Sequence, residues 1–129
     1  MKAKIYSLLM ILLFLSISIQ LSAQNNGLSV SLTKANGSIF STNGVGKHIL
    51  SFEISGIESP KQVENLLKYV RGYRGVEEFN IQPIEGTGKW MANGTFYEFS
   101  DMAYFKNLFK IMKVTEVFEN SQKTTIDNL

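Results

Sequence analysis

The chain of 129 residues contains no cysteine, and its charge is nearly balanced, with 13 lysines and arginines against 11 aspartates and glutamates. The absence of cysteine excludes disulfides, thiolate metal ligands, cysteine nucleophiles and lipid attachment at an N-terminal cysteine. The charge balance argues against a nucleic-acid-binding protein, which needs a basic face to neutralise phosphates.

Residues 1–23 have the features of a secretory signal peptide. Lys2 and Lys4 precede a largely apolar run from Ile5 to Ile19, and Ala23 places a small residue before the expected cleavage position. This run is shorter than the roughly 20 residues that span a bilayer, so we expect cleavage and no stable membrane anchor afterwards. The sequence therefore predicts an exported protein, periplasmic or secreted.

Removing these 23 residues from 129 leaves 106, enough for one compact domain with a single core. Two of the 13 basic residues lie in the leader, so the remaining chain has 11 basic and 11 acidic residues and a charge near zero. Residues 24–46 are rich in Asn, Gly, Ser and Thr. Within them Leu28, Val30 and Leu32 alternate with serines, which predicts one strand or a short hairpin.

From residue 47 the signals for secondary structure become stronger. Leu50, Phe52 and Ile54 alternate with polar residues and predict a strand with one buried face. Ser59 is a typical helix cap, and Pro60 suits the first position of the helix that follows. The apolar stripe of this helix consists of Val63, Leu66, Leu67 and Val70.

The second half of the chain predicts a hairpin, a helix and a final strand. Residues 76–81 and 89–97 are expected to pair through a glycine-containing turn. Residues 100–101 begin a second helix, and residues 114–118 form the last strand. Residues 121–129 are expected to form a polar C-terminal tail. The second helix has an apolar stripe of Met102, Phe105, Leu108, Phe109 and Met112.

The resulting order, β-α-β-β-α-β, predicts a ferredoxin-like α+β fold for residues 47–120. In this fold a four-stranded antiparallel sheet carries two helices on one face. The other face of the sheet is expected to remain open toward solvent or a partner, unless residues 24–46 lie across it.

The turn between the first strand and the first helix suggests a family. Residues 56–62 read Gly-Ile-Glu-Ser-Pro-Lys-Gln, and Gly75-Val76 follows thirteen residues after Gln62. This stretch resembles the heavy-metal-associated domains of copper chaperones and metal-pumping ATPases, whose first strand leads into Gly-Met-x-Cys-x-x-Cys and a helix ending at Gly-Val. The two metal-binding cysteines of that family fall on Ser59 and Gln62, and neither can supply a thiolate to soft copper. The resemblance therefore implies the family fold without its metal-binding activity, and we expect no cofactor.

Further candidate positions come from the predicted topology, which brings three loops to one edge of the fold. The resemblance extends over residues 48–119 and places Lys113 where some copper chaperones carry a loop lysine, although a solvated surface lysine explains it equally. Trp90 and Met91 begin the third predicted strand near the same edge. The candidate binding surface thus consists of Ser59, Gln62, Trp90, Met91 and Lys113.

The sequence favours a non-catalytic role. There is one histidine and no G-x-S-x-G motif, and the only adjacent carboxylate pair, Glu77-Glu78, would point to opposite faces of a strand. We therefore expect a small exported binding or interaction module whose partner is another protein or a peptide. Alternation along residues 90–99 cannot bury all of the aromatic residues there, and exposed aromatic residues are typical of surfaces that bind a partner. The alternative is a divergent metal-binding or metal-transport protein that uses His48, Trp90, Met91, Met102 and Met112.

Overall fold

The computed structural model describes residues 27–129, which form a seven-stranded sheet, two α-helices and a short 3-10 helix. The expected signal peptide, residues 1–23, lies outside the described residues. Within residues 27–129, no helix combines the length and the apolar character needed to cross a membrane.

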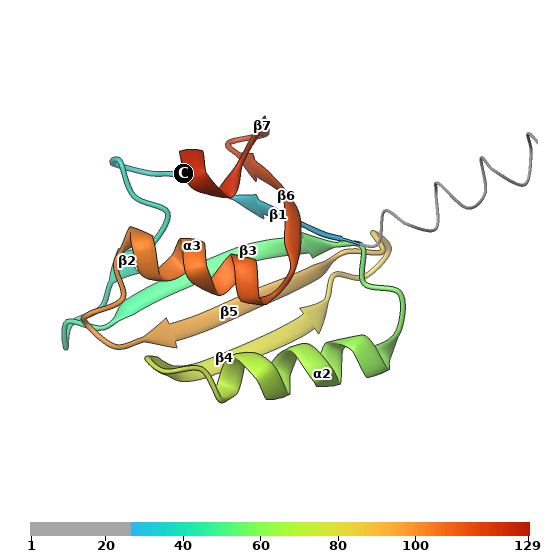
Figure 1. Ribbon diagram of the computed structural model, residues 1–129, viewed down its shortest axis with the longest axis horizontal. Helices are drawn as coiled ribbons and strands as arrows, with labels where there is room; N and C mark the ends of the chain where they lie inside the picture. The colour runs from blue at the N-terminus through green and yellow to red at the C-terminus, as the bar shows by residue number, and fades with distance from the viewer. Residues whose placement is uncertain (1–26) are drawn as a thin grey trace, which may run out of the picture.

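The elements follow the order shown in Figure 1. They are β1 (Leu28–Leu32), β2 (Ser41–Thr42), β3 (His48–Ser55), α2 (Pro60–Arg71), β4 (Val76–Pro83), β5 (Trp90–Phe96), α3 (Met102–Ile111), β6 (Val114–Glu119), β7 (Gln122–Thr124) and the 3-10 helix η1 (Ile126–Asn128). Residues 121–129, which the sequence assigned to a polar tail, thus include β7 and η1.

The prediction of a four-stranded antiparallel ferredoxin-like sheet is wrong. The strand order is β4-β5-β3-β1-β6-β7, with β2 also paired to β3, and the sheet is mixed and curls into a half-barrel (Figure 1). Strand β1 lies between β3, to which it is antiparallel, and β6, to which it is parallel. The physical reason is burial, because Leu28, Val30 and Leu32 all lie in the core. A strand between two neighbouring strands can bury such side chains while its backbone N–H and C=O groups are hydrogen-bonded on both sides.

One core joins the inner face of the sheet to both helices. Along β3, Leu50, Phe52 and Ile54 are buried while the residues between them are exposed or half-buried, as their alternation predicts. Phe52 meets Phe109 of α3 with the ring centroids 5.4 Å apart in an edge-to-face arrangement. Helix α2 contributes Val63 and other apolar residues to the same cluster.

Both helices begin where the sequence predicts. Ser59 is the N-cap of α2 with Pro60 in the first turn, and Asp101 is the N-cap of α3, where its carboxylate accepts a hydrogen bond from the Tyr104 N–H at 2.9 Å. These caps satisfy backbone donors that have no partner inside the helix. The starts of both helices are therefore set by local chemistry.

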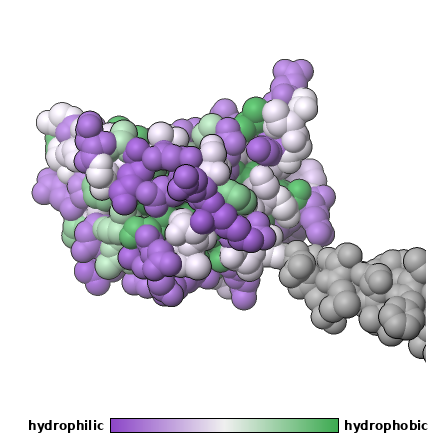
Figure 2. Space-filling model, turned by 90° about the horizontal axis from the view of Figure 1, so that it is seen from above, coloured by the Kyte–Doolittle hydropathy of each residue, from purple (hydrophilic) through white to green (hydrophobic). Residues whose placement is uncertain are grey.

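The outer face of the sheet and the surface seen from above are mainly polar. On the outer face Ser51 donates a hydrogen bond to Asn93 across β3 and β5 at 2.7 Å. Figure 2 shows hydrophilic residues over most of the surface seen from above, with apolar residues only in small areas between them. Apolar residues also line a hollow beside α2.

Candidate functional site

Ser59 and Gln62 hold the start of α2. The Ser59 hydroxyl accepts a hydrogen bond from the Gln62 N–H at 3.3 Å, and Gln62 Oε1 accepts one from the Glu58 N–H at 2.8 Å. This reciprocal arrangement resembles a capping box, in which two side chains satisfy donors at the helix start. The chemistry of the helix start therefore explains Ser59 without any ligand.

A groove lies between α2 and the junction of α3 with β6. Its volume is about 470 Å³, and its lining includes Gln62 from the start of α2 and Lys113 from the α3–β6 junction. The structure thus brings together two of the five residues that the sequence singled out. The apolar lining residues are Leu28, Leu66, Tyr69, Ile111 and Met112, and the other polar ones are Asn65 and Lys110.

A second hollow continues this groove along the helix. It has a volume of about 500 Å³, and its lining shares Asn65 and Tyr69 with the first and adds Lys68 and Gly72. We call the two hollows together the α2 groove. From Gln62 to Gly72 the helix rises about 15 Å, at roughly 1.5 Å per residue, which sets the length of the groove.

The groove exists because the apolar surface of α2 extends beyond the residues that enter the core. Val63 and Val70 are buried, whereas Leu66 is half-buried and Tyr69 is 71% exposed. Ile111 of α3, which is 39% exposed, faces the same hollow. Leu66, which the sequence placed on the apolar stripe of this helix, packs against the core, whereas the sequence had indicated no role for Ile111.

Lys110 and Lys113 are the basic residues on the α3 side of the groove. Lys110 donates a hydrogen bond to the Asp127 carboxylate at 2.9 Å, and this contact lowers the pKa of Asp127 below its ordinary value. Among the ion pairs within residues 27–129, none involves Lys113. The charge of Lys113 is therefore available to a ligand.

The backbone of Lys113 is in the left-handed region, with φ of 63°. It directly follows Met112, the C-cap of α3, and its N–H donates to the Lys110 carbonyl at 3.1 Å. Glycine is the usual residue at this position, because a Cβ in the left-handed conformation costs roughly 1–2 kcal/mol. A lysine here works against the stability of the fold.

Replacing Lys113 by glycine is expected to raise the free energy of unfolding by about 1 kcal/mol, because the strain at this position disappears. Urea denaturation followed by circular dichroism measures this change. The matched control is Lys113→Ala, which removes the same side chain but keeps the Cβ and should give no comparable gain. Equal stabilities for the two variants would contradict the strain argument.

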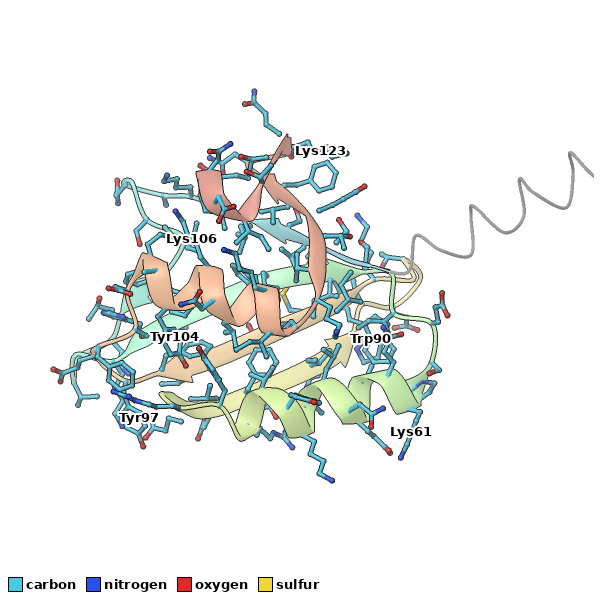
Figure 3. The ribbon with its side chains drawn as sticks, in the orientation of Figure 1. Lys61, Trp90, Tyr97, Tyr104, Lys106 and Lys123 are labelled. Atoms are coloured by element: carbon cyan, nitrogen blue, oxygen red, sulfur yellow. The ribbon has the colours of Figure 1, made fainter. Side chains whose placement is uncertain are left out.

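Trp90 and Met91 do not join the groove. They are successive residues of β5, so Trp90 points to the inner face, where it packs against the core, and Met91 points to the outer face. Trp90 pairs with Ile54 and Pro83, and Figure 3 places it at the end of β5 opposite Tyr97. The predicted binding surface is therefore assembled only in part.

The residues considered as metal ligands are not brought together. In the ladder between β3 and β5, His48 pairs with Phe96 at one end, whereas Trp90 pairs with Ile54 at the other. Met112 is buried, with 3% of its surface exposed. Within the described part of the chain, no group of three or more His, Cys, Asp or Glu residues has the arrangement to hold a metal ion.

His48 instead connects two segments of the fold. Its Nδ1 lies 2.5 Å from the Ser100 carbonyl oxygen and 3.0 Å from the Ser100 hydroxyl, and its ring stacks on Phe40 with centroids 4.4 Å apart. The Ser100 hydroxyl donates to the Tyr97 carbonyl at 2.6 Å. Because the hydroxyl proton is directed at a carbonyl, this histidine and serine do not form a nucleophile and its base.

An aromatic cluster occupies the end of the sheet near Tyr97 and Tyr104, both labelled in Figure 3. The Arg74 guanidinium lies 5.2 Å from the ring centroid of Phe99, and Lys47 lies 5.5 Å from that of Tyr97. The Tyr104 hydroxyl donates to the Arg74 carbonyl at 2.7 Å, and burial raises its pKa. Cations of the chain itself thus cover exposed rings here, which leaves the α2 groove as the stronger candidate site.

No protein-family model, curated protein or solved structure matches this chain. The resemblance to heavy-metal-associated domains therefore stays a prediction.

Proposed function

We propose that this protein is an exported, non-catalytic binding module and that its ligand lies in the α2 groove. The observation that carries the proposal is that two exposed apolar side chains, Tyr69 of α2 and Ile111 of α3, line the same hollow. Contiguous exposed apolar surface with a polar rim is typical of interaction sites, whereas single exposed apolar residues are common everywhere.

A binding role agrees with the rest of the groove. Leu28, Leu66 and Met112 supply a floor that belongs to or packs against the core, so the groove has a rigid base. A ligand that covers Tyr69 would gain hydrophobic free energy at little entropic cost to the protein, because a preformed surface loses little freedom on binding.

The proposal is tested by selecting binders from a random peptide library displayed on phage against the purified protein. Selected peptides are then measured against Tyr69→Asp and against the control Val45→Asp. Tyr69 and Val45 are 71% and 69% exposed, so the two variants each replace an exposed apolar side chain by the same carboxylate, one inside and one outside the groove. We expect Tyr69→Asp to weaken binding about tenfold or more, as for aromatic residues central to an interface, and Val45→Asp to leave it unchanged.

Two results would contradict the proposal. Selected peptides that bind both variants as tightly as the parent would place binding elsewhere on the protein. Failure to enrich any peptide on repeated selection would argue that the α2 groove is not a peptide-sized binding surface.

A further inference from the structure

We infer that the ligand of the α2 groove is an acidic peptide segment with an apolar side. This inference rests on the proposed function and adds the chemistry of the partner. It follows from the charge around the groove, from the identity of one residue on its rim and from its shape.

The charge of the groove has one sign. Lys68, Lys110 and Lys113 line its two hollows, and neither lining includes an aspartate or a glutamate. The chain outside the leader has equal numbers of acidic and basic residues, so this is a local excess and not a property of the whole surface. Lys110 shares its charge with Asp127, whereas no ion pair within residues 27–129 involves Lys68 or Lys113. Two cations are therefore left to attract an anionic partner.

Lys113, like Ser121, has a backbone conformation that favours glycine, but of the two only Lys113 lines the α2 groove. Its left-handed backbone favours glycine, and its ammonium has no carboxylate partner within the described residues. A residue that lowers stability without compensation in the fold is a mark of a functional position. In the α2 groove, that function would be to meet a negative charge above the apolar floor.

The shape of the groove favours a peptide over a small molecule. Pockets for small molecules usually enclose most of the ligand surface, but the α2 groove is open along the helix from Gln62 to Gly72. Its length of about 15 Å equals about ten residues of a helix. An amphipathic segment would place apolar side chains against Leu66 and Tyr69 and acidic ones toward the lysines.

The inference is tested with labelled peptides of about 16 residues, long enough for about four helical turns. One peptide has leucines on a single helical stripe and glutamates elsewhere, a second has lysines in place of the glutamates, and a third has the acidic composition in scrambled order. Fluorescence anisotropy measures the dissociation constant of each. We expect the acidic amphipathic peptide to bind about tenfold more tightly than the basic one, since two rim charges act together.

Salt provides a second measurement. Raising NaCl from about 0.1 M to about 1 M shortens the Debye length from about 10 Å to about 3 Å, so the preference for the acidic peptide should shrink. The scrambled peptide should bind more weakly than the ordered one, because its leucines no longer share a stripe.

Charge reversal on the protein gives the sharpest test. The double variant Lys68→Glu, Lys113→Glu should prefer the basic peptide, whereas the control Lys89→Glu, Lys123→Glu makes the same change of net charge outside the groove and should keep the acidic preference. Lys89 and Lys123 form long, exposed ion pairs of 4.0 and 3.6 Å, which contribute little stability, so we expect the control to fold, and circular dichroism checks this. If the first variant is misfolded by circular dichroism, Lys68→Gln, Lys113→Gln replaces it and should remove the preference.

The outcomes separate this inference from the proposed function. Equal binding of the acidic and basic peptides, lost in Tyr69→Asp, would overturn the acidic partner but leave the groove as the binding site. Laurate, a small amphiphile, is measured as a further probe. If laurate binds and none of the peptides does, the groove is a site for small amphiphiles and the inference is overturned. Peptide binding that Tyr69→Asp does not change would contradict the proposed function itself.

Discussion

Replacing Val30 by aspartate is expected to unfold the domain. Val30 has no exposed surface and lies in the centre of the sheet, opposite Ile54 of β3 on one side and Val117 of β6 on the other. A carboxylate at this position has no partner, and burying it costs several kcal/mol whether it stays charged or takes up a proton. Because small domains are stable by only about 5–15 kcal/mol, this change should remove most of the folded population at room temperature.

Circular dichroism and urea denaturation measure this loss, and Ser31→Asp is the matched control. Ser31 is the next residue of β1 but is half-buried on the outer face, opposite Glu53. Its replacement should cost about 1 kcal/mol or less, mainly through repulsion between two acids across the strands. A Val30→Asp variant that unfolds cooperatively with nearly the parent stability would contradict the central place of β1.

The second large effect is expected at Phe105 of α3. This side chain is fully buried, and its ring lies between Phe96 and Phe40, with centroids 5.0 and 5.1 Å away. Truncation to alanine removes these contacts and leaves a cavity, which typically lowers the free energy of unfolding by about 3–5 kcal/mol. Urea denaturation of Phe105→Ala measures the loss directly.

Phe99→Ala serves as the control for this prediction. Phe99 also contacts an aromatic partner, Tyr104, with ring centroids 5.9 Å apart, but it is 51% exposed. Its truncation should cost about 1 kcal/mol or less, since little apolar surface is returned to water. Similar losses for the two variants would mean that the Phe105 site collapses around the cavity or that the exposed ring packs more tightly than its exposure indicates.

The elements from β3 to β6 could be predicted because each has a local signal, whereas β7 and η1 lie in the segment that was expected to be a polar tail. The alternation of Leu50, Phe52 and Ile54 marks a strand wherever it lies, and Ser59 followed by Pro60 marks a helix start whatever packs on it. The order of strands in the sheet has no such signal. The alternation of Leu28, Val30 and Leu32 predicted one strand or a short hairpin, but the position of β1 between β3 and β6 depends on residues far away in the sequence.

The residues of the candidate site were likewise predicted only in part. Gln62 and Lys113 were singled out from the sequence and do line one groove. Trp90 and Met91 do not line it, and the predicted strand already implied that these two neighbours point to opposite faces and cannot share one surface. Ile111 was missed, since an apolar residue near the end of a helix looks like core until the neighbouring elements fail to cover it.

The parallel pairing of β1 with β6 has a consequence for how the chain folds. The contact between Leu28 and Thr115 joins residues 87 positions apart, and the strand at the centre of the sheet is the first of the described strands along the chain. Contacts at such sequence separation require a large loop to close before they contribute stability, which slows folding. During synthesis β1 would leave the ribosome early and keep one edge unpaired until β6 follows, so this edge is where a nascent chain would most need protection from mispairing.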